Sequence, residues 1–448
     1  MTRDMTIGSP ARHLITYALP VLLGSWLQLA YNAVDSIIAG QFIGQDALAA
    51  EGVAGPVMNL VILAISGLCV GAGVAMGEAF GAGDLSRFRR TLGGTLLLGL
   101  IIALPVTLLG ILLTPLLLRL LQVPEDIFDI AVLYLRVTFL GAPFTFLYNA
   151  LAAGLKSAGD SRTPLRFLAF SSILNAVLDL IFLGLLHFGI LCSAITTVAA
   201  EAASALLAVF YMKRRTAELM PAPGDLSPDR ALLRRVIGYG APAALQQATQ
   251  PIGKVLIQGQ IDALGVSAIA AFNAVTRVDD FACVPEQGIG AALSAYLAQN
   301  RGANKEDRLR PGFCSAILME CAYWLLIGSV AFFLGKPIVA LFVRGQDAPG
   351  VVPLGAEYLS YMAFFYLLPG LTNAVQGFFR GMGKLYTTVL ATAVQITVRT
   401  VSVYALVPRY GLIAVPFCCA AGWTLMLLIE IPYYFHFIRK RAKSLEQT

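Results

Sequence analysis

The chain has 448 residues, of which 58% are hydrophobic and only 13% charged, with a formal net charge of +6. A soluble globular domain carries about 25% charged residues, and several apolar segments here exceed the roughly 18 residues needed to cross a bilayer. This composition excludes a soluble protein, and the long continuous apolar runs exclude a β-barrel, whose strands alternate apolar and polar residues. The sequence predicts an all-α polytopic membrane protein.

Apolar runs of about 20 residues between polar breaks predict twelve transmembrane helices. Their expected ranges are 14–41, 53–76, 92–118, 127–152, 165–187, 189–212, 236–261, 272–298, 313–334, 353–379, 385–407 and 411–438. The first segment is too long for a cleaved signal peptide, so we expect it to remain as a span. We expect an N-terminal six-helix lobe over 1–212, a cytoplasmic linker over 213–235 and a C-terminal six-helix lobe over 236–448.

Lysine and arginine lie mostly on one side of the predicted spans. The two termini, the linker and the loops that follow even-numbered spans hold 24 of the 32 basic residues, and the opposite loops hold four. By the positive-inside rule, both termini and the linker are expected to be cytoplasmic. The basic residues mark a membrane face and are not interleaved with aromatic residues, so we expect no nucleic-acid partner.

Three polar residues share one face of the first span. Gln28, Asn32 and Asp35 are spaced by four and then three residues, which places them on the same side of a helix. An ionisable residue inside a span is costly and usually faces a bundle interior or a wet cavity. We therefore predict a functional site at Asp35. The alternative is a buried hydrogen-bond anchor between helices.

The chain is built from two similar halves. The matching pairs, at offsets of 221 to 224 residues, are Pro20/Pro242, Gln28/Gln250, 81–87/302–308, Asn149/Asn373 and Lys156/Arg380. Matches in order at nearly one offset indicate a duplication. Because each copy has an even number of spans, both copies enter the membrane from the same side. We expect a pseudo-two-fold axis along the membrane normal, with a substrate cleft near mid-membrane between the lobes.

The fifth span carries one polar stripe that ends in Asn175 and Asp179. Two carboxylates on neighbouring helices at low dielectric will not both ionise easily, so Asp35 and Asp179 are expected to bind a proton outside and release it inside. The same oxygens, with Asn175 and a hydroxyl of Thr196 or Thr197, can instead coordinate Na⁺. The remaining alternative is a structural polar network.

The second copy departs from this pattern. The positions equivalent to the polar stripe are Gln395 and Arg399, and Lys254 replaces the asparagine of the first span. Lys254 lies on a stripe with Gln250 and Gln258. We hypothesise that Lys254 faces the cleft, where it pairs with an acid of the first lobe or receives an anionic or zwitterionic group. The alternative is that it snorkels or pairs within its own lobe.

Two further acidic sets remain. Glu201 in the sixth span is expected either to join the acidic cluster or to make a lone interhelical hydrogen bond. We interpret Arg277, Asp279, Asp280 and Glu286 in the eighth span mainly as local ion pairs. Phosphate-binding loops, zinc spacings and nucleophile motifs are absent from the sequence, so we expect no enzyme and no cofactor.

Several stretches together resemble transporters of the MATE (multidrug and toxic compound extrusion) family. They are LPVLLGSWLQLAYNAVDSIIAGQFIGQDALAA, FGAGD, LKSAGDSRTPL, the Asn175/Asp179 pair and QNRGANKEDR. The resemblance covers nearly the whole chain and looks closest to the DinF-like branch. It implies export of organic solutes coupled to inward H⁺ or Na⁺, and it places Asp35, Asn175 and Asp179 in the family's ion-coupling cluster.

Some Na⁺-linked members of that family carry an acidic residue in the seventh span, whereas this chain has none there before Asp262. We therefore favour H⁺ over Na⁺. The residues assigned to the cleft are Gln28, Asn32, Gln250, Lys254, Gln258, Gln395 and Arg399.

The expected protein is a secondary active multidrug exporter that works by cation antiport and alternating access. We expect a monomer in the cytoplasmic (inner) membrane of a bacterium, with a small organic substrate and membrane lipid as its partners. The alternative is a lipid-linked precursor flippase of the same superfamily, because a basic cavity would suit a lipid pyrophosphate.

Overall fold

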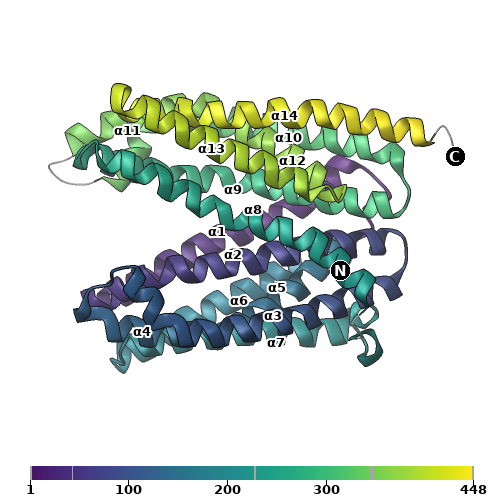
Figure 1. Cartoon of the computed structure of the whole chain (residues 1–448), viewed down its shortest axis with the longest axis horizontal. Helices are drawn as coiled ribbons and strands as arrows, with labels where there is room; N and C mark the ends of the chain where they lie inside the picture. The colour runs from purple at the N-terminus through teal and green to yellow at the C-terminus, as the bar shows by residue number, and fades with distance from the viewer. Residues whose placement is uncertain (1–2, 43, 227–228, 344–347, 446–448) are drawn as a thin grey trace. The chain divides into compact units, whose positions relative to one another are not determined.

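A computed structural model describes residues 3–42, 44–226, 229–343 and 348–445, and every regular element in this part of the chain is a helix (Figure 1). The α-helices are α1 (Pro10–Phe42), α2 (Gln45–Gly81), α3 (Leu85–Leu120), α4 (Glu125–Phe139), α5 (Ala142–Ser157), α6 (Arg162–Asp179), α7 (Ile190–Arg215), α8 (Arg230–Asp262), α9 (Val266–Gly302), α10 (Leu309–Phe342), α11 (Ala348–Phe365), α12 (Leu367–Gly381), α13 (Leu385–Tyr410) and α14 (Ala414–Leu445).

Each of the twelve predicted spans is a helix or a pair of helices. The fourth is α4 with α5, and the tenth is α11 with α12, which are bent by 43°. Within the described residues, eight helical stretches are long and apolar enough to cross a membrane, or nine with the bent pair, and one of them contains both α13 and α14. The seventh and eighth spans are α8 and α9. They carry many polar side chains and are not among these apolar stretches.

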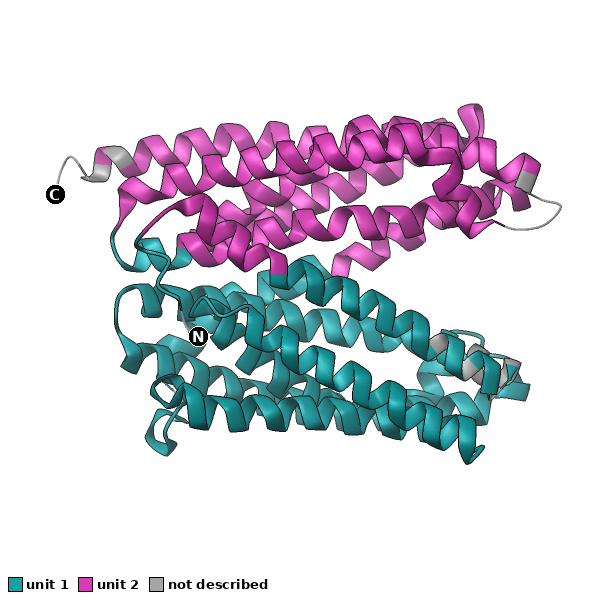
Figure 2. Cartoon of the chain, turned by 180° about the vertical axis from the view of Figure 1, so that it is seen from behind, with its two compact units in different colours: residues 1–7, 20–247, 298–304 teal, residues 8–19, 248–297, 305–448 magenta. Residues whose placement is uncertain are grey.

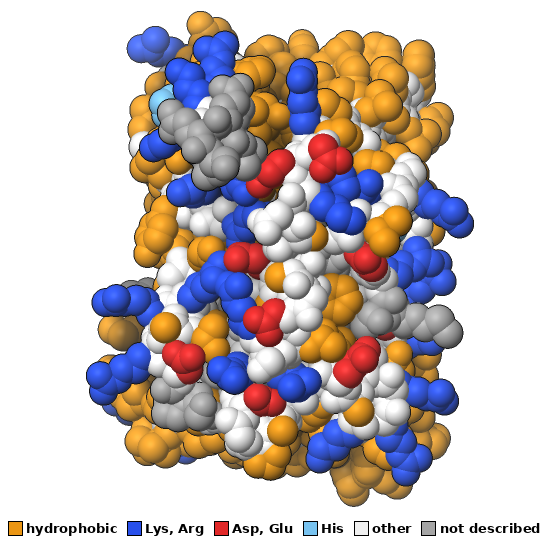
Figure 3. Space-filling model, turned by 90° about the vertical axis from the view of Figure 1, so that its right-hand side faces the viewer, with side chains coloured by type: hydrophobic (Ala, Val, Ile, Leu, Met, Phe, Trp, Pro, Cys, Tyr) orange, Lys and Arg blue, Asp and Glu red, His pale blue; other side chains and the backbone are white. Residues whose placement is uncertain are grey.

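The outer surface of α3 shows why these helices belong in a membrane. Leu100, Leu104, Leu108, Leu112 and Leu116 recur every four residues and are 52–61% exposed. This contiguous apolar stripe would be costly in water, whereas lipid tails accept it. Figure 3 shows the contrasting situation at one face of the molecule, where acidic and basic side chains gather. The chain is a membrane-embedded helical protein.

The duplication is visible in the backbone of the turns. Eight of the ten described residues with positive φ form four equivalent pairs, at offsets of 221 or 224 residues. The pairs are Gly44/Gly265, Gly83/Asn304, Gly159/Gly383 and His187/Gly411. The breaks between α4 and α5 and between α11 and α12 also occupy equivalent places. The two copies therefore share their turns as well as their spans.

The chain forms two compact units (Figure 2). Unit 1 comprises Met1–Ile7, Pro20–Gln247 and Ala298–Asn304, and unit 2 comprises Gly8–Leu19, Ala248–Leu297 and Lys305–Thr448. Helices α1, α8 and α9 each run from one unit into the other. The division into lobes 1–212 and 236–448 follows the repeat and remains a prediction.

The C-terminal ends of α2 and α9 cross within unit 1 with their backbones in contact. A Cβ atom on Gly81 would lie 1.9 Å from the carbonyl oxygen of Gln299, and one on Gly302 would lie 1.9 Å from that of Glu78. Gly81 and Gly302 are equivalent in the repeat, as are Glu78 and Gln299. The contact is therefore reciprocal, as a two-fold relation between the two helix ends requires.

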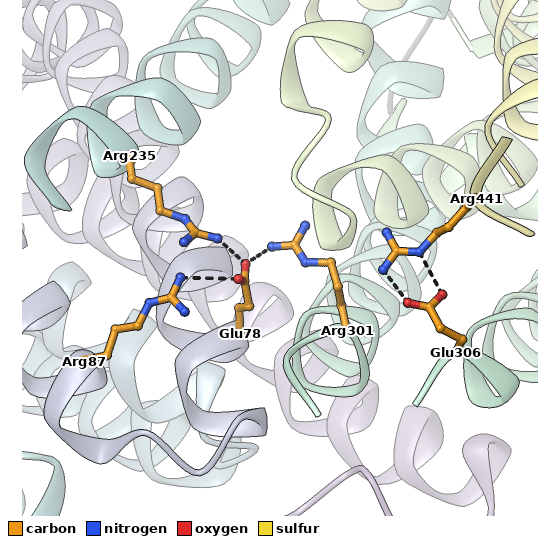
Figure 4. Close-up of polar contacts among 6 residues, drawn as sticks. All are labelled: Glu78, Arg87, Arg235, Arg301, Glu306 and Arg441. Atoms are coloured by element: carbon orange, nitrogen blue, oxygen red, sulfur yellow. Dashed lines mark hydrogen bonds and ion pairs between the residues drawn. The ribbon is translucent and has the colours of Figure 1, made fainter. Parts of the chain in front are cut away.

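Glu78 is held by three guanidinium groups beside this crossing (Figure 4). Its carboxylate pairs with Arg87 of α3 at 3.3 Å, with Arg235 of α8 at 2.5 Å and with Arg301 of α9. The Glu78 side chain is 16% exposed, so solvent screens these pairs only in part. The cluster ties α3 and the ends of α8 and α9 to α2.

We expect Gly81→Ala and Gly302→Ala each to destabilise the protein, because the added methyl group must push the two backbones apart. Overpacking of this kind costs about 1–3 kcal/mol, which lowers the melting temperature. Gly55→Ala on α2 is the matched control, since nothing lies within 4 Å of its Cβ position. Thermal unfolding of the purified protein in detergent measures all three variants, and equal melting temperatures would contradict the crossing.

Glu78→Gln should also lower the melting temperature, because it leaves three guanidinium groups facing one another without their carboxylate. Removing one partner of a buried ion pair costs about 3–5 kcal/mol, and partial exposure reduces this figure. The control is Glu306→Gln, since Glu306 pairs with the single guanidinium of Arg441 at the α10 end of unit 2 (Figure 4). A control variant that loses as much stability as Glu78→Gln would contradict the role of the cluster.

Candidate functional site

The two predicted acidic residues of the first half meet in unit 1. Asp35 on α1 and Asp179, the last residue of α6, lie within hydrogen-bonding reach of each other, and Asp179 is fully buried. Two carboxyl groups can share such a bond only when one of them carries a proton. The arrangement can therefore hold a proton between α1 and α6.

Helices α6 and α7 supply neutral partners for this pair. Thr196 donates its hydroxyl hydrogen to Asp179 Oδ1. In the amide orientation that matches donors with acceptors, Asn175 donates to Asp179 Oδ2 at 2.9 Å and to Tyr31 Oη at 3.3 Å. In the same orientation it accepts from the backbone N–H of Thr197 at 3.1 Å. The structure thus brings Asn175, Thr196 and Thr197 together around Asp179.

Tyr31 is the member of this cluster that sequence reasoning missed. It lies on α1 one turn before Asp35, and its hydroxyl is within reach of Thr197. Its spacing of four from Asp35 was the available signal, but the pattern favours the more polar Asn32. In the structure, Gln28 Nε2 instead donates to Asn32 Oδ1 at 3.4 Å on an exposed part of α1.

Glu201 of α7 lies beside the cluster, at the break between α4 and α5. Its carboxylate accepts a hydrogen bond from Thr145 and occupies the space that a side chain on Gly141, the N-cap of α5, would need. Glu201 also interacts electrostatically with Tyr31. It therefore connects the helix break to the acidic cluster.

The polar side-chain atoms of this cluster are all oxygens, apart from one amide nitrogen. Carboxylate, hydroxyl and amide oxygens can bind a hard cation such as Na⁺, and the carboxylates can also bind a proton. Within the described residues, no group of three or more His, Cys, Asp or Glu side chains could hold a metal ion. Asp179 also stands where α6 passes into a π-helical turn, Leu180–Leu185, an irregularity that is frequent at functional sites.

Lys254 finds its partner within unit 2. Its Nζ lies 3.0 Å from Oδ1 of Asp280 on α9, and the two side chains are 61% and 45% exposed. This contact is the alternative in which Lys254 pairs within its own lobe, and it gives Asp280 the local ion pair expected in the eighth span. Asp279 instead accepts from Tyr366 Oη at 2.5 Å.

Arg399 reaches the same part of α8. Its Nη2 lies 2.6 Å from the Cβ position of Gly253, the residue before Lys254. A basic group of α13 therefore lies against the turn of α8 that carries Lys254. The other predicted residues of this unit are Gln395, which is buried on α13, and Gln250 and Gln258, which are exposed and half-buried on α8.

A family model described as MatE matches residues 20–181 and 242–405, once in each copy of the repeat. The chain is 29% identical over 384 residues to "Probable multidrug resistance protein YpnP" of Bacillus subtilis, with 85% of each chain covered. It is 28% identical over 337 residues to "FAD transporter" of Shewanella oneidensis, with 74% of each chain covered.

Solved structures share the fold. The TM-score is 0.90, at 22% identity and with 100% of each chain covered, to "Outward-facing conformation of a multidrug resistance MATE family transporter of the MOP superfamily". It is 0.89, at 23% identity and with 99% and 98% covered, to "Reverse polarity of binding pocket suggests different function of a MOP superfamily transporter from Pyrococcus furiosus Vc1".

These likenesses confirm the predicted fold of twelve transmembrane helices in two six-helix lobes. The two segments that match the family model make up most of the chain. The chain belongs to the MatE family, whose members are membrane transporters and not enzymes.

Proposed function

We propose that this protein is a secondary active exporter of organic solutes that exchanges each solute for an inward-moving cation, H⁺ in preference to Na⁺. The observation that carries the proposal is the pair Asp35 and Asp179, placed to share a proton between α1 and α6. Two relatives from Bacillus subtilis, each described as a probable multidrug resistance protein, support export of foreign organic compounds.

The proton acts by changing the charge of the pair. When it is present, the two carboxyl groups form a hydrogen bond and hold α1 against α6. When it leaves, two negative charges face each other at low dielectric and repel. Thr196 and Asn175 hold Asp179 in place, so Asp35 is the side chain that moves. The position of α1 therefore depends on whether the site holds a proton.

Na⁺ fits this site less well than a proton. A hard cation needs several oxygen ligands at once, and the oxygens of Asp179 already accept hydrogen bonds from Thr196 and Asn175. A proton needs only the two carboxyl groups. This difference is the reason for preferring H⁺.

The setting follows from the distribution of charge and from the repeat. We propose that the protein lies in the cytoplasmic membrane of a bacterium with both termini and residues 213–235 in the cytoplasm, because basic residues concentrate there. We further propose that it acts as a monomer whose two lobes are 1–212 and 236–448, with no cofactor besides the coupling ion.

The basic groups of unit 2 bear on the charge of the solute. Lys254 is paired with Asp280 yet 61% exposed, and Arg399 reaches the adjoining Gly253. We propose that this surface receives an anionic or zwitterionic solute, which displaces Asp280 from Lys254. A relative described as an FAD transporter, and a similar structure described by a reversed polarity of its binding pocket, support this choice.

Asp35→Asn should abolish transport driven by a pH gradient, because an amide cannot take up and release the shared proton. We expect flux from proteoliposomes to fall to the level of empty liposomes, whereas Asp129→Asn, on an exposed part of α4, keeps the wild-type rate. The pH and Na⁺ gradients are imposed separately. Wild-type flux that ignores both gradients, or full flux in Asp35→Asn, would refute the coupling site.

Lys254→Ala should reduce transport of anionic and zwitterionic compounds and leave permanently cationic dyes unaffected, because only the former need a positive partner. Lys254→Arg, which keeps the charge, should retain most of the anion flux. Lys336→Ala, at an exposed position of α10, is the control for lost surface charge. Transport of cationic dyes alone, with Lys254→Ala unchanged, would rule out an anion-receiving role.

A further inference from the structure

Three glutamates are buried among the described residues of unit 2; Glu430 interacts with Arg380, and the proposed mechanism uses neither of the other two. Glu286 on α9 and Glu320 on α10 are each 1% exposed, and none of their four carboxylate oxygens has a hydrogen-bond partner among the described residues. An ionised carboxylate in such a place is very costly, whereas a protonated one is tolerated. A buried carboxylate without a hydrogen-bond partner is therefore expected to bind a ligand that neutralises its charge, and the smallest such ligand is a proton.

The two side chains are neighbours. Glu286 is the charged residue that acts most strongly on Glu320, and both act on the hydroxyl of Tyr323. Tyr323 donates to the carbonyl oxygen of Ala282 at 2.8 Å. Ala282 lies one turn before Glu286, and Tyr323 lies one turn after Glu320. This hydrogen bond therefore joins α9 to α10 at the level of the two carboxyl groups.

Glu320 also faces the break between α11 and α12. Its Oε2 is 3.1 Å from the Cβ position of Gly370 in the first turns of α12, so the absence of a side chain on Gly370 makes room for the carboxyl group. Tyr366, the N-cap of α12, donates to Asp279 at 2.5 Å. Asp279 lies two turns before Glu286 on α9. Acidic groups therefore extend from the helix break to the buried pair.

Among the described residues, the pair interacts electrostatically with acidic, thiol and phenol groups. The titratable groups that act on it are Asp279, Cys283, Cys321, Tyr323 and Glu286 or Glu320 itself. The nearest base on the packed helix α12 is Arg380, which faces Gly290 one turn beyond Glu286. Its electrostatic partner is Glu430 of α14. With acidic groups as their neighbours, the two carboxylates cannot be ionised together without strong repulsion.

In the first copy, the glutamate at the equivalent helix break has a hydrogen-bond partner. At the break between α4 and α5, Glu201 is satisfied by the hydroxyl of Thr145. The equivalent of Thr145 in the second copy is Pro369, which has no hydrogen to donate. The acid that faces the equivalent break, between α11 and α12, is Glu320 of α10. The unsatisfied pair is thus a property of the second copy.

We propose that Glu286 and Glu320 form a second proton-binding site, in unit 2, which takes up and releases protons independently of Asp35 and Asp179. The step is the addition of H⁺ to one carboxylate, which removes one of the two interacting negative charges. The protein therefore exchanges protons at two places, one in each unit. This inference goes beyond the proposed coupling at Asp35 and does not depend on it.

The test uses the full-length Asp35→Asn protein in lipid nanodiscs, so that the first pair cannot share a proton. Infrared difference spectra between alkaline and acidic pH detect the C=O stretch of each carboxyl group that becomes protonated. We expect a pH-dependent carboxyl band that is lost on adding Glu286→Gln or Glu320→Gln and kept on adding Glu306→Gln. A band unchanged in both single variants would overturn the proposal.

A second measurement is needed if the glutamate variants fold poorly in the Asp35→Asn protein. Proton uptake per protein is counted with a pH indicator after an acid jump, in otherwise wild-type protein whose elution on size exclusion is normal. We expect Glu286→Gln and Glu320→Gln each to bind fewer protons than Glu306→Gln over the same pH range. Equal uptake would overturn the second site. Loss of transport in Asp35→Asn with normal uptake by the two glutamates would separate the two proposals.

Discussion

Direct backbone contact between α2 and α9 is the constraint on which unit 1 depends. Lipid gives helices little hydrophobic reason to associate, so close approach over small residues has to supply the packing. Gly81 and Gly302 allow that approach in a reciprocal pair, one from each copy of the repeat. Where the two helix ends touch, Arg301 of α9 joins Arg87 and Arg235 around Glu78. The glycine contact thus brings α9 into the charged cluster.

The two copies keep one backbone plan and carry different chemistry on it. In the first copy the acids are on α1 and α6 and share polar partners on α7. In the second copy the equivalent helices present Lys254 and Arg399, and the acids have moved to α9 and α10. A transporter with identical lobes would have identical ion sites. Here the duplication gives both copies the same helix arrangement, and substitutions within each copy determine which charged side chains the helices carry.

Helix ranges, the repeat and the acidic pair could be predicted from sequence because each rests on local pattern. Apolar length fixes the spans, a constant offset reveals the copies, and spacing places Asp35 and Asp179 on inward faces. The partners of Lys254 and the isolation of Glu286 could not be predicted, since they depend on side chains that are distant in sequence. Tyr31 lies between these cases: its spacing was correct, but nothing in the sequence distinguishes a tyrosine that binds Asn175 from one that anchors the span.

The paired turns say something about the history of the chain. Left-handed backbone costs an ordinary residue about 1–2 kcal/mol and glycine almost nothing. Nevertheless, Asn304 and His187 have a positive φ where the other copy has Gly83 and Gly411. After the ancestral gene doubled, glycine at these sites was exchangeable and the bend was not. Between the two copies, the sign of φ at these turns is therefore kept more closely than the residues that occupy them.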